Sequence, residues 1–155
     1  MSSAFEPEQF LDAAITQPLV KRPPADAGRP YPATIGEGKI RPWQSEKGGE
    51  LRSGFAMDVP LEILLPEDVA ARVGQPKIVL NDSLFLDTTV GGGLDMAPGR
   101  NRGLRTYYDA TGLNKPGSTP RMLQGHMITV VLKHEMAKDG SGDLYARVAS
   151  IARAA

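Results

Sequence analysis

The sequence predicts a mainly β domain, in which five strands form a Greek-key barrel with one main helix before the last two strands. One observation is the run at residues 126–132 (HMITVVL), which is rich in β-branched residues and lacks Gly and Pro. A second is the flexible polar turn at 138–143, which leads into another strand-like run at 144–151. These two runs are expected to pair as a hairpin, around which the upstream strands close the barrel.

The composition fits one domain over residues 1–155, since 41% hydrophobic residues suffice for a single core. No apolar run is long enough to cross a bilayer, and the first ten residues lack the pattern of a secretory signal. We therefore expect a soluble, cytoplasmic protein with no membrane contact. The chain has no Cys, which excludes disulfides, thiol nucleophiles and thiolate metal sites.

Charge is segregated along a chain whose formal net charge is +0. Residues 53–99 contain seven acidic and two basic residues, whereas residues 100–121 contain five basic residues and one acidic residue. Such segregation can produce one positive face on a neutral protein, although two solvated surfaces explain it equally well.

The first 20 residues are expected to form an arm or a short amphipathic helix, with Pro7 in the first turn and Pro18 as a stop. A Pro-rich connector then leads to a first strand at 31–35. Because proline lacks a backbone N–H, Pro32 is expected either in an edge strand or at the start of a strand.

The middle of the chain is expected to alternate between strands and inserts. Residues 36–54 are Gly-rich and charged, which predicts a long, mobile hairpin loop. Residues 55–64 are predicted to be a strand with a bulge or an edge position at Pro60. Residues 66–73 form a short inserted helix that ends before Gly74. Residues 77–87 follow as a strand pair or one long bent strand.

A main helix is predicted over residues 101–111, after a glycine-rich loop at 88–99. Leu104, Tyr107 and Tyr108 fall on one side of it, and Gly112 is its C-terminal stop. The resulting order of elements is that of a five-stranded OB-like barrel.

Several stretches also resemble one family. They are Phe5-Glu6-Pro7, the segment 27–35 (AGRPYPATI), the helix 102–112, and Gln124-Gly125-His126 before a Val-rich strand. On these features the chain resembles the OB-fold single-stranded DNA-binding proteins of bacteriophages, encoded beside replication and recombination genes. The resemblance implies a protein that protects single-stranded DNA in the host cytoplasm, with no catalytic residues, no metal site and no cofactor.

Binding of single strands requires exposed aromatic rings for the bases and cations for the phosphates. Trp43 lies between Arg41 and Lys47 in a polar segment, and Tyr31 lies at the start of the first strand. Alternatively, Trp43 folds back as a lid on the barrel. The predicted DNA-binding residues of this region are Tyr31, Lys39, Arg41, Trp43 and Arg52.

Further candidate cations lie downstream. Arg100, Arg102 and Arg105 crowd the start of the main helix, where the helix dipole disfavours cations unless an anion binds there. Lys133 and Arg147 of the final hairpin are expected to line a groove. Ordinary solvated side chains are the alternative in both cases.

Two other classes of function remain open. The near-zero net charge and the apolar N-terminal segment favour a protein-interaction or virion structural module, with homo-oligomerisation through that segment. A metal-dependent nuclease would need the strand acids to converge on Mg²⁺. These acids are Asp58, Glu62, Asp82 and Asp87.

Overall fold

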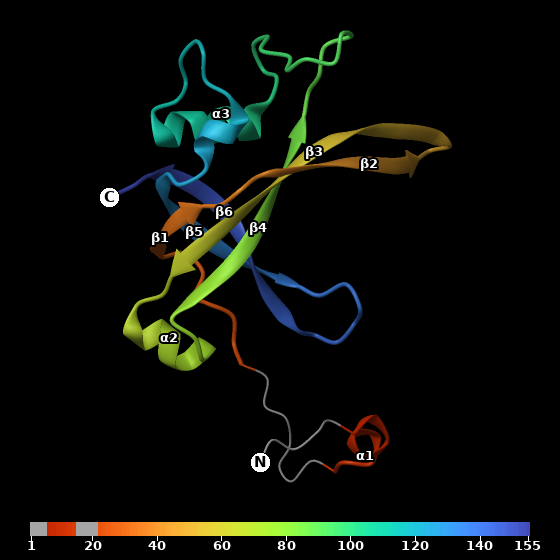
Figure 1. Cartoon of the computed structure of the whole chain (residues 1–155), viewed down its shortest axis with the longest axis vertical. Coiled ribbons are helices and arrows are strands. Elements are labelled where there is room, and N and C mark those ends of the chain that lie inside the picture. Colours follow the sequence, from red (N-terminus) through yellow and green to blue (C-terminus); the bar gives the residue numbers. More distant parts are fainter. Residues whose placement is uncertain (1–5, 15–21) are drawn as a thin grey trace.

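The computed structural model describes residues 6–14 and 22–155 of the chain (Figure 1). Within these ranges the protein is mainly β, with six strands, three α-helices and one 3₁₀ helix. Their bounds are α1 Pro7–Leu11, β1 Pro30–Ile35, β2 Lys39–Lys47, β3 Glu50–Leu64, α2 Glu67–Val73, β4 Lys77–Leu86, α3 Arg102–Thr111, η1 Pro120–Leu123, β5 Met127–Met136 and β6 Leu144–Arg153. The predicted C-terminal hairpin, the inserted helix and the main helix are confirmed.

The six strands form one antiparallel sheet organised around β3. Its path runs β2-β3-β1-β5-β6, and β4 pairs with the other edge of β3. β1 and β2 occupy successive parts of one β3 edge, with Ile35 opposite Leu61 and Lys39 opposite Asp58. β3 therefore pairs with β1, β2 and β4, whereas β5 and β6 join the sheet through β1 (Figure 1).

The change of partner along β3 occurs at Pro60. The Gly36 N–H donates to the Pro60 carbonyl at 2.8 Å, so the polar groups of Pro60 point toward the break between β1 and β2. The missing N–H of Pro60 therefore falls where no ladder is formed. The predicted edge position at Pro60 is wrong, because β3 is paired on both sides.

β1 is also an interior strand, since it lies between β3 and β5. The edge position considered because of Pro32 is therefore wrong. Pro32 pairs with Thr129 of β5, but the ladder between β1 and β3 begins only at Ala33. The backbone nitrogen of Pro32, which has no hydrogen to donate, thus lies outside the ladder between β1 and β3.

The hairpin predicted over residues 36–54 is present, but β2 and the start of β3 pair regularly over most of the length that was predicted as its loop. Gly48 and Gly49 connect the strands, with φ of 63° and 81°. Two successive left-handed residues are typical of a two-residue type I′ turn, which matches the twist of the paired strands.

The core lies between the inner face of the sheet and the apolar side of α3. Leu104, Tyr107 and Tyr108 of α3 are buried, as predicted. The side chain of Asn101, 1% exposed, fixes the start of this helix by accepting from the Asp87 N–H at 2.8 Å and donating to its carbonyl at 2.9 Å. The strands contribute Tyr31, Ala33, Ile35, Met57, Val59, Leu61, Ile63, Leu84, Ile128, Val130 and Leu132.

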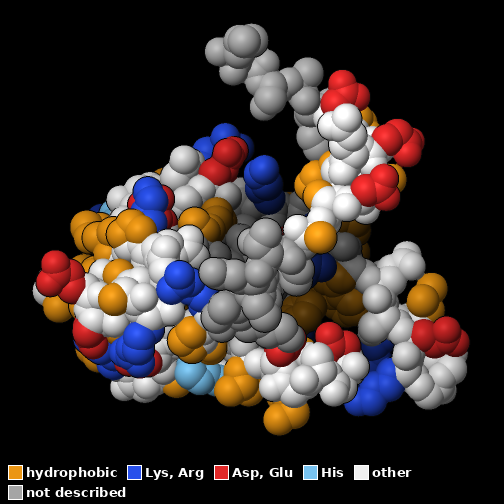
Figure 2. Space-filling model, turned by 90° about the horizontal axis from the view of Figure 1, so that it is seen from below, with side chains coloured by type: hydrophobic (Ala, Val, Ile, Leu, Met, Phe, Trp, Pro, Cys, Tyr) orange, Lys and Arg blue, Asp and Glu red, His pale blue; other side chains and the backbone are white. Residues whose placement is uncertain are grey.

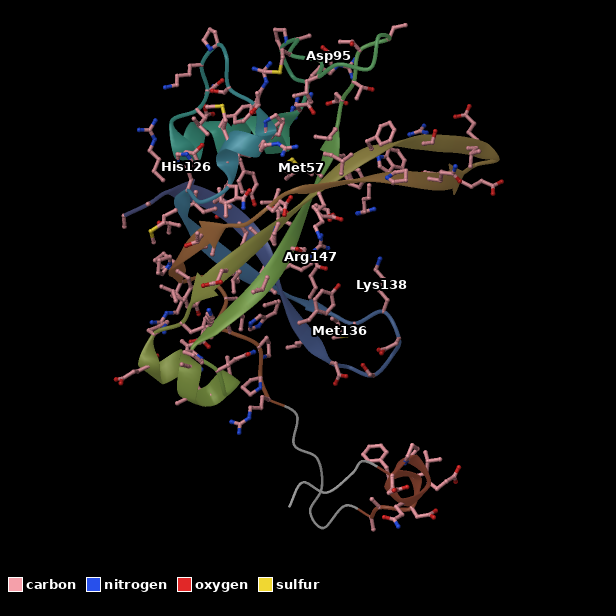
Figure 3. The ribbon with its side chains drawn as sticks, in the orientation of Figure 1. Met57, Asp95, His126, Met136, Lys138 and Arg147 are labelled. Carbon is pink, nitrogen blue, oxygen red and sulfur yellow. The ribbon has the colours of Figure 1, made fainter. Side chains whose placement is uncertain are left out.

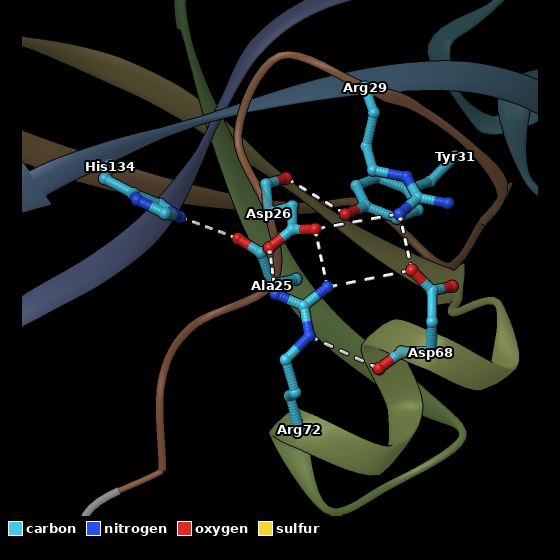
Figure 4. A network of polar contacts seen from close by, with 7 residues as sticks. All are labelled: Ala25, Asp26, Arg29, Tyr31, Asp68, Arg72 and His134. Carbon is cyan, nitrogen blue, oxygen red and sulfur yellow. Dashed lines mark hydrogen bonds and ion pairs between the residues drawn. The ribbon is translucent and has the colours of Figure 1, made fainter.

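α2 is held against the connector that precedes β1 (Figure 4). Arg72 donates to both carboxylate oxygens of Asp26, at 2.8 and 2.7 Å, and Arg29 pairs with Asp68 at 3.0 Å. The insert thus covers the start of β1 through ion pairs that cross between sequence-distant segments.

β4 and β6 face each other across a gap that no ladder between them is found to close. One end of the gap is a groove of about 640 Å³ between Ile78–Leu80 and Leu144–Ala146. The other end is a cavity of about 240 Å³ under α3, bounded by Asp82, Tyr107 and Val148. The open region is therefore covered in part by α3.

The described part of the predicted N-terminal arm contains the short helix α1, none of whose residues is buried. Residues 1–5 and 15–21 of that arm lie outside the described residues. Within the described ranges, no helix has the length and apolar character needed to span a bilayer.

The contact between Gly36 and Pro60 makes a testable prediction. A Cβ at residue 36 would lie 2.9 Å from Pro60 Cγ and 3.3 Å from its carbonyl oxygen. Gly36→Ala should therefore lower the free energy of unfolding by about 1–3 kcal/mol, measured by urea denaturation. Gly91→Ala is the matched control because a Cβ there meets nothing within 4 Å. Equal denaturation midpoints for both variants would contradict this account.

Candidate nucleic-acid interface

The register of the β2–β3 hairpin brings four of the predicted DNA-binding residues to one face. Lys39, Arg41 and Trp43 alternate along β2, and Arg52 of β3 pairs with Ser45, which continues the same alternation. On β4, Phe85 pairs with Ala56, the residue that also pairs with Arg41. We call this surface the Trp43 face, defined by Lys39, Arg41, Trp43, Arg52 and Phe85.

Trp43 packs flat on the sheet rather than into the core. A Cβ at Gly54, its partner on β3, would approach three atoms of the indole to 3.0 Å. The indole Nε1–H donates to the Phe55 carbonyl at 3.3 Å, and the Phe85 ring meets the indole edge-on with centroids 5.5 Å apart. The lid alternative is therefore wrong, and Trp43 forms an aromatic pair on the outer surface.

Arg41 is held beside this pair by a carboxylate. Its Nε donates to Asp58 at 2.8 Å, and the Ser83 hydroxyl donates to the same carboxylate at 2.6 Å. The Ser83 hydrogen bond and then the Arg41 charge keep the pKa of Asp58 below its ordinary value. Arg41 is nevertheless 46% exposed and can still offer donors to a ligand.

The other cations of the Trp43 face have weaker partners. Among the described residues, Lys39 makes no ion pair, and Arg52 lies 4.0 Å from Glu50 while its side chain stays 64% exposed. These two side chains are the ones most available to an anionic ligand.

Tyr31 does not belong to this surface. Its ring is 1% exposed, its hydroxyl donates to the Asp26 carbonyl at 3.0 Å, and the Arg29 guanidinium lies 5.7 Å above the ring (Figure 4). The prediction that Tyr31 stacks on a base is wrong for this structure, because the inward alternation of β1 places it in the core.

Two of the three arginines at the start of α3 have protein partners where an anion was predicted. Arg105 donates to the carbonyls of Arg100, Met96 and Ala97, and so ties the preceding loop to the helix. Arg100 lies 3.7 Å from Asp95. Of the three predicted arginines, Arg102 alone makes no ion pair or side-chain hydrogen bond with the described residues.

Lys133 and Arg147 are opposite each other on the β5–β6 pair, as their predicted outward positions require. Both reach Glu135, at 3.5 and 2.9 Å, and the Tyr145 hydroxyl donates to the same carboxylate at 3.1 Å. The Arg147 hydrogen bond lowers the pKa of Glu135 most. Figure 3 places Arg147 on β6 and Lys138 in the turn that follows β5. The structure does not join this cluster to the Trp43 face.

The strand acids do not converge. Asp58 and Glu62 pair with Arg41 and Lys77 on the outer face, at 2.8 and 3.3 Å, whereas Asp82 accepts from Tyr107 at 2.7 Å on the inner side. Within the described residues no group of three or more His, Asp or Glu side chains is arranged to hold a metal ion. The magnesium site required by a nuclease is thus not formed in that part of the chain.

Phe85 and Gly54 were missed from the sequence. Phe85 is 66% exposed on a strand whose alternate residues point inward, and Gly54 is the only residue type that lets the indole lie on β3. The available signal was the alternation of apolar and polar residues over 77–86, which places residue 85 on the face of the strand opposite to Leu84.

On the face shown in Figure 2, acidic and basic side chains are interspersed among exposed hydrophobic ones.

Comparison of the chain with protein-family models, curated proteins and solved structures finds no match to any of them.

Asp58 of β3 and Asp82 of β4, which lie on opposite faces of the sheet, predict opposite pH dependences. Burial raises the pKa of Asp82, opposed by the Tyr107 hydrogen bond and by the Arg147 charge, whereas the pKa of Asp58 is lowered. Because the pKa of Asp82 is raised in the folded protein, this group contributes stability at pH values below 3.8, its ordinary pKa. That stability is lost as the pH rises through the raised pKa of the folded state. Because the pKa of Asp58 is lowered, this group contributes stability at pH values above 3.8, and that stability is lost as the pH falls through the lowered pKa of the folded state.

Relative to wild type, Asp82→Asn should therefore gain stability as pH rises from about 3 to about 7. Asp58→Asn should lose stability over the same interval, by a smaller amount because Asp58 is partly exposed to screening solvent. Urea denaturation across this range measures both. Parallel slopes for the two variants would show that the two carboxyl environments do not differ as described.

Proposed function

We propose that this protein binds single-stranded DNA on the Trp43 face, and that it protects exposed strands during phage replication or recombination. The observation that carries the proposal is the cross-strand arrangement of the half-buried Trp43 and the exposed Phe85 among Lys39, Arg41 and Arg52 on one outer surface of the sheet. Aromatic rings flanked by cations offer stacking for bases and contacts for phosphates, without reading sequence.

The fold supports this proposal. We infer that the sheet is an OB-type barrel: α3 lies between β4 and β5, β1 pairs with both β3 and β5, and β4 faces β6. In such barrels, the surface of the second and third strands and the loops beside it bind oligonucleotides. β3 and β4 would be those strands, and in Figure 1 the β2–β3 and β5–β6 hairpins extend to the same side of them.

Charge on the face favours stacking over electrostatic attraction as the main contribution. Arg41 is paired with Asp58, so part of the positive charge of the face is neutralised within the protein. Duplex DNA presents mainly phosphates, whereas a single strand also offers unstacked bases to Trp43 and Phe85. A preference for single strands follows from this balance.

The direct test is fluorescence anisotropy of a labelled oligonucleotide, with duplex DNA as competitor and Trp43 emission recorded in parallel. The expected result is binding of the single strand with quenching of Trp43, a weaker effect of duplex, and an affinity that falls as salt is added. Failure to bind the oligonucleotide at low salt would overturn the proposal.

A variant series tests the assignment to the Trp43 face. Trp43→Ala should weaken oligonucleotide binding by about 5- to 150-fold, which corresponds to ~1–3 kcal/mol for one stacked base. Phe85→Ala should act in the same direction, because Phe85 supports the indole edge-on. Arg121→Ala, a cation on η1 outside the face, is the control and should bind like wild type. Wild-type affinity in Trp43→Ala, with circular dichroism unchanged, would remove the site.

A second candidate is a protein-interaction or virion structural module that assembles through its N-terminal segment. The observation favouring it is the exposure of apolar residues on α1, where Phe10 is 65% and Leu11 is 77% exposed. Removal of residues 1–17 should then lower the mass measured by light scattering. An unchanged oligomeric state would leave this candidate without support.

A further inference from the structure

A cavity of about 350 Å³ lies beside α3, between the loop that precedes the helix and the segment that follows it. Met96 lines it from the preceding loop, Arg105 and Tyr108 from α3, and Lys115 and Ser118 from the following segment. None of these residues is part of the Trp43 face, so this cavity is a separate feature of the molecule.

Two hydroxyl groups of this cavity wall lack partners. Tyr108 Oη and Ser118 Oγ are the buried side-chain oxygen or nitrogen atoms for which no hydrogen bond is found among the described residues. Tyr108 is only 3% exposed. Buried polar atoms in folded proteins are nearly always paired, so these two hydroxyls, on residues that line the cavity, call for a polar partner.

The charge of the wall specifies that occupant. Arg105 is fixed by its Nε and Nη2 bonds to loop carbonyls, whereas its Nη1 makes no hydrogen bond with the described residues. Lys115 makes no ion pair within that part of the chain, and no acidic side chain lines the cavity. The nearby Asp109 is held by the Asn114 amide at 2.7 Å.

The protonation state of Tyr108 is consistent with a donor role. Burial raises the pKa of its phenol, so the hydroxyl keeps its proton at neutral pH. The wall therefore combines two cationic side chains with two hydroxyl donors. Charged and neutral donors around one cavity, without a carboxylate among its lining residues, are the chemistry that binds an oxyanion.

We propose that this cavity is an oxyanion site that binds a phosphate group through Tyr108 Oη, Ser118 Oγ, Arg105 Nη1 and Lys115 Nζ. Its volume accommodates a phosphate together with part of the molecule that carries it. Both hydroxyl oxygens have almost no solvent contact, so the phosphate reaches them through a shift of residues 115–118. The bond within that segment, from the Ser118 N–H to the Lys115 carbonyl, is long at 3.4 Å.

Thermal unfolding in inorganic phosphate tests the proposal, with chloride at equal ionic strength and pH as reference. At ten times its Kd, phosphate should raise the Tm of the wild-type protein by about 4 °C. Amide chemical shifts should move at Gly117 and Ser118 over the same concentration range. The rise in Tm should be lost in the double variant Tyr108→Phe with Ser118→Ala, which removes only the unpartnered oxygens and is expected to fold.

Lys115→Ala should also reduce the response to phosphate, whereas Lys138→Ala, a lysine in the β5–β6 turn, should keep it. An equal rise in the double variant would show a general effect of phosphate on protein hydration and would overturn the site. No rise in the wild-type protein would overturn it as well, and would leave water as the occupant of the cavity.

Oligonucleotide binding by the Lys115→Ala variant identifies the molecule that carries the phosphate. If Lys115→Ala lowers affinity for a single-stranded oligonucleotide as well as for inorganic phosphate, the site takes a phosphodiester of the bound strand. If only the response to inorganic phosphate falls, the site takes a free phosphate or nucleotide. The inorganic phosphate measurement stands even if the protein binds no oligonucleotide, so the two proposals fail separately.

Discussion

The fold depends on β3 being paired along both edges. β4 follows one edge from Phe55 to Leu64, while β1 and β2 share the other and meet at Gly36 and Pro60. A glycine and a proline are usually weak points in a sheet, yet here each occupies the place that needs it. Gly36 leaves room for the proline ring, and Pro60 has no donor to leave unpaired. Because the chain breaks between β1 and β2 at this point, β2 continues along β3 and extends the sheet beyond the core.

This extension creates the Trp43 face. Beyond the core, the outer surface of β3 contains the small residues Gly54 and Ala56, and larger side chains from both neighbouring strands cover them. Ala56 is 0% exposed although it lies on the outer surface. The indole and the Phe85 ring are therefore supported by the sheet itself, which fixes a half-buried indole beside an exposed ring at little entropic cost.

Local sequence patterns predicted the elements whose structure depends on residues close together in the sequence. The C-terminal hairpin, α2 with its glycine stop and the buried side of α3 all follow from periodicity and end signals. The strands of the β2–β3 hairpin were predicted as part of a long hairpin loop, because their charged, glycine-rich sequence has no apolar alternation. Most residues of β2 are exposed, and only Gly48-Gly49 signals the turn.

By itself, the sequence determined that this is a mainly β domain without cysteine chemistry, and it singled out Trp43 and Arg41 as neighbours of interest. The tertiary structure alone decided which candidates meet. It placed Phe85 beside Trp43, buried Tyr31, and gave Arg105 and Arg147 partners within the protein. The physical reason is that strand register and cross-strand distance depend on pairings between residues far apart in the chain, which no local pattern of residues encodes.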